Sequence, residues 1–435
     1  MLFLARHWRE LWSGGFTVIP KKTADGMRLL ATVAVTSLNA VWAVPAVILI
    51  RLLRRFHYFS SGTVDSSRVG AFVGDAILFF LTAKPGKKRT ALLWYARPPA
   101  NEQWDRMLRR TFVVGNWVKH VDTFNRLLPG GRGQAYVYSG VRDLTGLLES
   151  NEEVIEFTWD EEERAKTWLR RRGWRDGEPF VCLLARDSAY LDSYLSAPPN
   201  SNEGWSYHDY RDSDIALFVE AVQALTHRGY WVIRMGKIMR QPFPGIHERI
   251  IDYPFVEDKD DLLDIWLSAN CFFFISTSAG LDHAAIGYRR PVCLVNFLPF
   301  SDAQTWVDMV GAPKWLRWKQ SGCRLTMAEM LEHSHHRTAH YARAGILIED
   351  LTPSQLRDAV LECEGRITGT WLETPSEAEA QRRFWSLFKS WPMFGQMHGA
   401  IHPKARVARS WLEDAGADLL ADASSVLYRS APLPP

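Results

Sequence analysis

The sequence has few cysteines and no large excess of charge of one sign, and each of these features excludes a class of protein function. Its cysteines show no C-x-x-C spacing, and three lie in or beside apolar runs; they are Cys182, Cys271, Cys293, Cys323 and Cys363. We therefore expect reduced thiols in a reducing compartment and no zinc site. The 52 Lys and Arg against 49 Asp and Glu give a formal charge of only +3, which argues against a nucleic-acid partner.

Disorder is a poor description of this chain, because 435 residues with a 47% hydrophobic share can form two domains plus extensions. One long uncharged run, residues 29–50, stands out near the start. Its length could cross a bilayer, but Asn39, Pro45 and the amphipathic residues 1–12 before it equally allow a helix in the membrane interface. A buried helix of the first domain is the third interpretation.

Basic residues flank the uncharged run on both sides: Arg28 before it, and Arg51, Arg54 and Arg55 after it. Such a flank suits an anionic cytoplasmic leaflet. We expect membrane association, with the chain at the cytoplasmic face of the inner membrane as a peripheral or singly anchored protein.

Strand-like and helix-like segments alternate through most of the chain. After the short strand at 56–61 come an expected loop at 68–75 and a helix. A strand and a second helix follow by residue 114. From residue 180 onward, strands that are apolar on both faces alternate regularly with helices, as in a parallel sheet covered on both sides. The predicted fold class is α/β, with two Rossmann-like lobes and an apolar N-terminal helical segment.

The expected domain division follows from this pattern. Residues 1–55 form the apolar and basic segment, 56–150 the N-terminal acceptor lobe, and 151–178 a linker whose charged helix matches the helix dipole. Residues 179–350 form the C-terminal nucleotide-sugar lobe, and 351–435 a helical tail.

Ligands of parallel sheets bind at the carboxyl ends of the strands, and several polar residues follow the predicted strands there. The turn Ser276-Thr277-Ser278-Ala279-Gly280 passes into a helix that carries His283. Its small residues and the helix N-terminus suit a diphosphate, although a hydroxyl N-cap on a core helix explains the turn equally well. The other candidates for donor binding are Arg186, Asp187, Arg211, Arg234, Gly236, Lys237 and Asn296.

The long segment from Ser188 to Tyr210 lies at the same expected edge and is typical of a lid or an acceptor surface. His208 in it is either a base or an ordinary loop histidine. Asp212-Ser213-Asp214 more readily caps the following helix than binds a metal, because no apolar strand leads into it. The histidines His333, His335, His336 and His340 are interpreted as an exposed helix face.

The stretch from YHDYRDSDI through FFFISTSAG to RRPVCLVNFLP resembles a bacterial family of two-Rossmann (GT-B) glycosyltransferases associated with surface-polysaccharide gene clusters. The resemblance covers residues 56–350 and is strongest at 207–299. It implies a nucleotide-sugar site at Arg234, Gly236, Ser276, Ser278, Gly280 and Asn296. The family loop has histidine where this chain has Ala71, in Arg68-Val69-Gly70-Ala71-Phe72, so the candidate catalytic residues here are Arg68, Asp75 and His208.

We expect a glycosyltransferase that moves a sugar from a nucleotide-sugar co-substrate to a lipid-linked or polysaccharide acceptor, with no resident metal or cofactor. A nucleotide-sugar epimerase or hydrolase is the alternative enzyme, and a membrane-attached scaffold that binds the nucleotide without turnover is the non-enzymatic one.

Overall fold

The computed structural model describes residues 19–419 except 132–133, 137, 150–153 and 195–205. The amphipathic residues 1–12 of the sequence lie outside this part. The described residues divide into two compact units: the first combines those within 1–63, 83–95 and 112–137, and the second holds the remainder. The expected α/β class, with separate parallel sheets and an apolar N-terminal helix, is confirmed.

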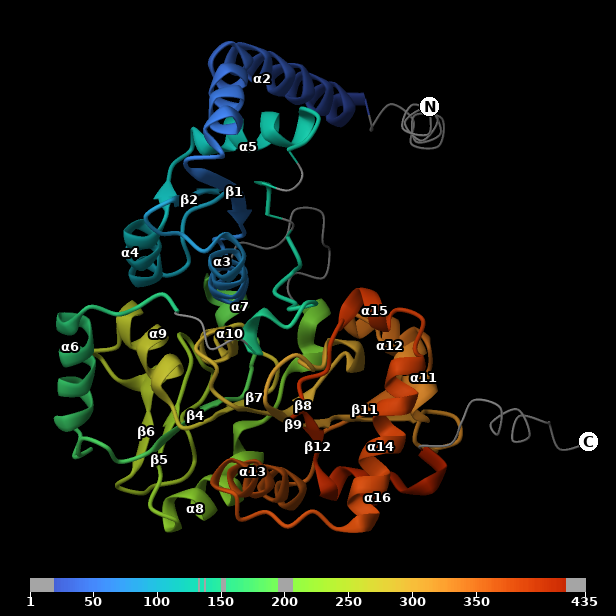
Figure 1. The fold of residues 1–435 in the computed structure, drawn as a ribbon. Coiled ribbons are helices and arrows are strands. Elements are labelled where there is room, and N and C mark those ends of the chain that lie inside the picture. The colour runs from blue at the N-terminus through green and yellow to red at the C-terminus, as the bar shows by residue number, and fades with distance from the viewer. Residues whose placement is uncertain (1–18, 132–133, 137, 150–153, 195–205, 420–435) are drawn as a thin grey trace, which may run out of the picture. The chain divides into compact units, whose positions relative to one another are not determined.

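The first unit contains a three-stranded sheet in the order β1-β2-β3, in which β2 and β3 run parallel. Its helices α2 and α5 pack against each other, as Figure 1 shows. Its elements are α2 (Ile19–Leu53), β1 (Tyr58–Val64), β2 (Arg89–Tyr95), β3 (Val113–Val114) and α5 (Val118–Leu127).

The second unit is built on a seven-stranded sheet in the order β12-β9-β8-β7-β4-β5-β6, in which every neighbouring pair is parallel. Its strands are β4 (Phe180–Leu184), β5 (Trp231–Arg234), β6 (Ile250–Asp252), β7 (Phe274–Ser276), β8 (Val292–Phe297), β9 (Met309–Pro313) and β12 (Arg406–Val407). A separate antiparallel pair is formed by β10 (Trp315–Trp318) and β11 (Ile346–Glu349).

Helices cover both faces of this sheet, α8 and α13 on one and α9 and α10 on the other (Figure 1). The helices of the unit are α3 (Val69–Ala83, whose last residue belongs to the first unit), α4 (Glu102–Thr111), α6 (Trp159–Arg170), α7 (Ala189–Tyr194), α8 (Val219–His227), α9 (Asp261–Asn270), α10 (Asp282–Gly287), α11 (Met327–Glu332), α12 (Thr338–Arg343), α13 (Pro353–Thr368), α14 (Pro375–Ser390), α15 (Phe394–Met397) and α16 (Arg409–Leu419).

The strand order reverses at one place. From β4 the chain adds β5 and β6 on one side and then returns to place β7, β8 and β9 on the other. The loops after β4 and β7 therefore diverge, and the gap that opens at their carboxyl ends is where doubly wound sheets bind ligands. All strand residues of β4, β5, β7 and β8 are buried, which explains why these segments are apolar without alternation.

Two local expectations were wrong. Residues 69–75 are not a loop but the first two turns of α3. The glycines that resembled loop residues serve close packing instead, because a Cβ on Gly70 would lie 2.7 Å from the Cα of Gly280. The histidine cluster is not a helix face either: of its four residues only His340 lies inside a helix, and the others occupy the connection between α11 and α12.

Candidate functional site

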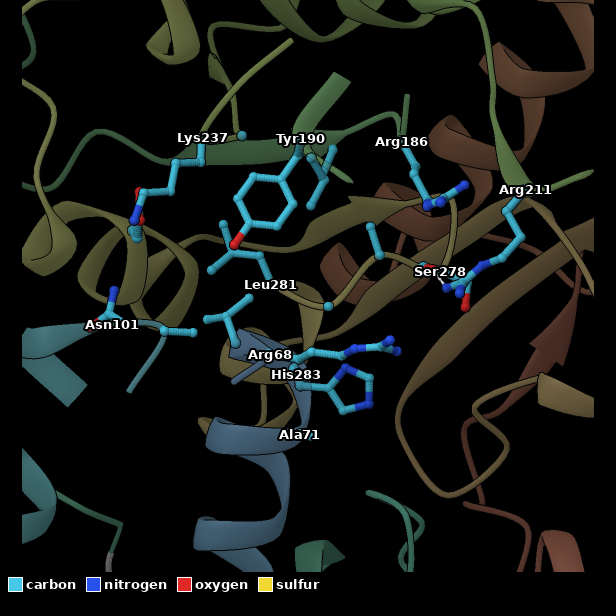
Figure 2. Close-up of a pocket in the computed structure, with 18 of the residues that line it drawn as sticks. Arg68, Ala71, Asn101, Arg186, Tyr190, Arg211, Lys237, Ser278, Leu281 and His283 are labelled. Carbon is cyan, nitrogen blue, oxygen red and sulfur yellow. Dashed lines mark hydrogen bonds between the residues drawn. The ribbon is translucent and has the colours of Figure 1, made fainter. Parts of the chain in front are cut away.

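A cavity of about 390 Å³ opens at the strand-order reversal, within the second unit. Its walls come from the segments after β4, β5 and β7, from the start of α3 and from α9 (Figure 2). Of the four strand ends that were expected to converge, three, at Arg186, Gly236 and Ser278, line one cavity, and the fourth, at Asn296, does not.

The turn after β7 forms the floor of this cavity with its backbone. Ser278 has φ of +62°, in the left-handed region, and the Ser276 hydroxyl accepts a 3.2 Å hydrogen bond from the Ala279 N–H. Gly280 then meets Gly70 at the start of α3, where a Cβ on Gly70 would clash with the Gly280 backbone and one on Gly280 would be tight at 3.1 Å from the Gly70 nitrogen. The two backbones therefore touch, and the first N–H groups of the 15-residue helix α3 lie at the cavity wall.

Four basic side chains line the cavity: Arg68, Arg186, Arg211 and Lys237 (Figure 2). Arg211 donates to the Ser278 carbonyl, and Arg186 donates to the His208 carbonyl at 3.0 Å and pairs with Asp212. Burial, and then the charge of Arg211, lowers the pKa of Arg186. Such a concentration of cations in a concave, partly dry site favours a ligand with more than one negative charge.

Two buried polar atoms at the cavity wall have no partner among the described residues. They are Nε of Arg211 and Nδ1 of His208. Burial, followed by the charges of Arg211 and Arg186, lowers the pKa of His208 to about 3, so the imidazole is neutral at physiological pH. A neutral ring beside an unpaired guanidinium donor favours a bound ligand over a salt-bridge network that is already complete.

A carboxylate orients the second histidine of the cavity. His283 Nδ1 lies 2.7 Å from Oδ1 of Asp282, which is fully buried. The other oxygen of Asp282 accepts from the Ser276 hydroxyl at 2.7 Å and from Gln304 at 3.3 Å. This pairing fixes the ring and leaves Nε2 as its remaining nitrogen, the arrangement in which a histidine exchanges a proton with a ligand.

Asp264 lines the cavity and was missed at the sequence level. It lies in the first turn of α9, accepts a 2.8 Å hydrogen bond from the Tyr253 hydroxyl, and has its pKa raised to about 7 by burial. The available signal was a carboxylate set among leucine, isoleucine and tryptophan in the helix before the strand that leads to the Ser278 turn.

Some predicted site residues do line the cavity and others do not. Those that line it are Arg68, Arg186, Asp187, His208, Arg211, Gly236, Lys237, Ser278, Gly280 and His283. Ser276 and Thr277 are fully buried beneath it, where the Thr277 hydroxyl accepts from the Arg186 N–H at 2.9 Å. These two residues hold the turn and do not reach the cavity.

Asn296 is buried away from the cavity, where it joins two loops. Its amide nitrogen donates to the Ser213 hydroxyl at 2.9 Å, and its oxygen accepts from the Leu351 N–H at 2.7 Å. Asp75 is likewise fully buried in α3, and its Oδ1 accepts from the Val141 N–H at 3.1 Å. Neither side chain lines the cavity, so of the candidate catalytic residues Asp75 is displaced from it, whereas Arg68 and His208 line it.

Arg234 lines a second cavity, of about 350 Å³, and not the first. It is the last residue of β5 and pairs in register with Asp252 of β6, 3.3 Å from its carboxylate, while donating to the Gln241 carbonyl at 2.7 Å. Burial lowers its pKa. Asp214 caps the next helix by accepting from the Ala216 N–H at 2.9 Å, which confirms the capping interpretation of that residue.

No protein-family model and no curated protein matches the chain. Solved structures similar to it include a glycosyl transferase family 9 protein from Veillonella parvula, with 11% identity, 59% of this chain and 86% of that chain covered, and a TM-score of 0.36. Another is E. coli ADP-heptose lipopolysaccharide heptosyltransferase II, with 12% identity, 59% and 90% covered, and a TM-score of 0.30. A third is the dodecameric iron-containing heptosyltransferase TibC in complex with ADP-heptose, with 15% identity, 72% and 77% covered, and a TM-score of 0.33.

Proposed function

We propose that the chain is a glycosyltransferase whose donor is a nucleotide-activated sugar and whose acceptor is lipid-linked or a surface polysaccharide. The observation that carries the proposal is the cavity at the strand-order reversal, with four basic side chains and the N-terminus of α3 around it. A sugar nucleotide matches it because a diphosphate needs concentrated positive charge and the nucleoside needs an adjoining apolar wall.

Apolar side chains form another part of the cavity lining. Ile238, Met239 and Leu281 line the cavity there together with the ring of Tyr190, and Asp264 lies among the lining residues of α9. In this arrangement the base packs on the apolar side chains. The Asp264 carboxylate is the acceptor for ribose hydroxyl groups, and Arg186 and Arg211 hold the phosphates.

Sugar transfer leaves a nucleoside diphosphate, so negative charge grows on the phosphate oxygen as the bond to the anomeric carbon breaks. Arg211, held against the Ser278 carbonyl, and the α3 N-terminus stabilise that charge, which is the task of a divalent metal in other transferases. His283, oriented by Asp282, takes the proton of the acceptor hydroxyl. His208 is the weaker candidate because its pKa is lowered to about 3 by burial and neighbouring charges.

The first test is binding of nucleoside diphosphates to the Arg211→Ala variant. A charge-assisted hydrogen bond contributes about 1.5–3 kcal/mol, so the affinity for the best diphosphate of an ADP, UDP, GDP and dTDP panel should fall about 10- to 100-fold. Arg382→Ala is the matched control, because Arg382 pairs with Glu379 on the exposed face of α14. Isothermal titration gives the affinity, and thermal unfolding shows whether both variants remain folded.

Turnover distinguishes transfer from the alternatives. With the matching sugar nucleotide and a lipid extract, a transferase attaches the sugar to an acceptor, whereas an epimerase or hydrolase gives an altered or free sugar, and a scaffold gives none. Equal diphosphate affinity in the parent and in Arg211→Ala would remove this residue from the site. Absence of binding by every nucleotide in the panel would refute the proposed donor class.

We also propose that α2 attaches the chain to the cytoplasmic face of the inner membrane. The support is its apolar segment Val33–Leu53, which is long enough to cross a bilayer. Only 11% of its most apolar 18-residue window is buried within the protein. Attachment would keep a lipid-linked acceptor close to the enzyme.

A further inference from the structure

Positive charge is concentrated in the first unit. Its three segments contain 15 Lys and Arg but only three Asp and Glu, whereas the rest of the chain has 37 against 46. One of the three acids, Asp122, is buried and bonded to Ser61 and Arg126. A unit this basic, within a chain that is almost neutral overall, has the charge of a surface that meets an anionic partner.

Helix α2 of this unit is apolar on the face that packs and on the faces that do not. Ala43 and Val47 are buried, and Val47 joins a core with Leu92, Val118 and Val121. Other apolar side chains of the helix are exposed, each by half or more: Val33, Val35, Leu38, Val41, Ile48, Leu49 and Leu52. A soluble amphipathic helix would place polar residues there, so this surface has the composition of one that contacts lipid.

Two polar side chains inside the apolar segment, Asn39 and Trp42, find partners within the helix itself. The amide of Asn39 donates to the Val35 carbonyl at 2.7 Å, and its oxygen accepts from the Trp42 indole N–H at 2.8 Å. These hydrogen bonds lower the cost of moving Asn39 and Trp42 into an apolar environment.

Four cations lie where the exposed apolar surface ends, and we call them the basic collar: Arg54, Arg55, Lys87 and Lys88. They come from two segments joined by the hydrogen bond from the Tyr58 N–H to the Lys88 carbonyl, 2.9 Å long. All four are exposed, as is Phe56 between them, at 78%.

Arg51 does not belong to the collar, although it lies in the same basic run. Its guanidinium donates to the Asn125 carbonyl at 2.8 Å and to the Pro129 carbonyl at 2.6 Å, so it caps the end of α5. Its charge is therefore used to fix α5 against α2, and the collar supplies the charge that faces outward.

We infer that the basic collar binds acidic phospholipid headgroups, so that α2 enters membranes whose facing leaflet is anionic in preference to neutral ones. The inference rests on the membrane attachment proposed above and is independent of the transfer reaction. A nucleic acid would match the charge of the collar but not the uncharged helix surface that adjoins it, so a lipid surface is the partner that both features fit.

The test is partitioning of the full chain onto vesicles of phosphatidylcholine alone and of phosphatidylcholine with about 30% phosphatidylglycerol, without nucleotide. Each cation near an anionic surface contributes about 1 kcal/mol, or about fivefold in partitioning. The variant Arg54→Gln/Arg55→Gln/Lys87→Gln/Lys88→Gln should therefore lose about two to three orders of magnitude on the anionic vesicles and change little on the neutral ones. Salt at about 0.5 M should weaken the parent and leave the variant almost unaffected.

The matched control is Lys319→Gln/Lys389→Gln, which removes exposed charge from the second unit and should leave partitioning unchanged. Thermal unfolding checks that each variant is folded. The inference would be overturned if the parent partitioned equally onto both vesicle types, or if the collar variant lost partitioning onto both types. Tighter binding of the collar to single-stranded RNA than to anionic vesicles would also overturn it. Because no substrate is present, a failed transfer assay leaves this result intact.

Discussion

Replacing Asp264 by asparagine should stabilise the protein at pH 8 and change its stability much less at pH 4. The Asp264 side chain lies at the wall of the charged cavity and accepts a hydrogen bond from Tyr253, and burial raises its pKa from 3.8 to about 7. An ionised carboxylate is therefore held where the protonated form is preferred, and asparagine keeps the shape and the acceptor oxygen without the charge.

The sign and size follow from proton linkage. Because the pKa is higher in the folded than in the unfolded chain, the folded state binds more protons between about pH 4 and pH 7, and stability falls as pH rises through that window. At about 1.4 kcal/mol per unit of pKa, the carboxylate costs at most about 4 kcal/mol above pH 8. The neutral amide of Asp264→Asn has no such cost, so the advantage of the variant should grow to about 2–4 kcal/mol between pH 4 and pH 8.

Urea unfolding followed by tryptophan fluorescence at pH 4, 5, 6, 7 and 8 measures this difference. Asp176→Asn is the control of opposite sign, because a hydrogen bond from Arg170 lowers the pKa of the exposed Asp176 carboxyl. An advantage of Asp264→Asn that is the same at every pH would refute the ionisation argument. The same variant should bind the matching nucleoside diphosphate more weakly, since ribose hydroxyls would lose a charged acceptor.

Two further predictions concern the cavity wall. Gly70→Ala would place a Cβ 2.7 Å from the Gly280 Cα, so we expect a lower Tm and weaker diphosphate binding. The control Gly86→Ala adds a Cβ that meets no atom within 4 Å and should change neither quantity. Normal diphosphate binding by Gly70→Ala would show that the contact is dispensable. Diphosphate binding should also raise the lowered pKa of His208, because the negative ligand cancels the field of Arg186 and Arg211. Calorimetric titrations of the diphosphate near pH 5, in buffers of different ionisation enthalpy, should therefore show proton uptake on binding. This uptake should be absent in His208→Gln.

Sequence patterns predicted the second unit well where burial is uniform. Strands such as β4 and β7 are buried along their whole length, so they appear as short apolar runs bounded by polar turns. The short strands β9 and β12 were not predicted, because they are recognisable as strands only through their pairing. Strand β12 has two residues, and both pair with β9. The strand propensity of two residues does not indicate which strand they pair with.

The residues predicted at the loops line the cavity, whereas some side chains predicted at strand ends do not reach it. Arg234 and Asn296 were selected because they occupy strand ends, but Arg234 pairs with Asp252 on the neighbouring strand and Asn296 bonds Ser213 and Leu351. The direction of Arg234 depends on the pleat and on the register with β6, and that of Asn296 on the irregular pairing of β8 with β9. A single sequence specifies neither. Gly236 and Lys237, two and three positions after Arg234, have left the sheet and reach the cavity.

The charge distribution shows most clearly what chain folding adds to composition. A net charge of +3 excludes a strongly basic protein, and that exclusion holds for the chain as a whole. The first unit nevertheless gathers three separate segments with an excess of 12 positive charges, which the acidic remainder cancels in the total. Lys87 and Lys88 lie more than 30 residues from Arg54 and Arg55 in the sequence, and they join the same collar only because Lys88 bonds Tyr58 across β1 and β2. An anionic surface responds to charge within about 10 Å, so its affinity is set by this local excess and not by the sum over the chain.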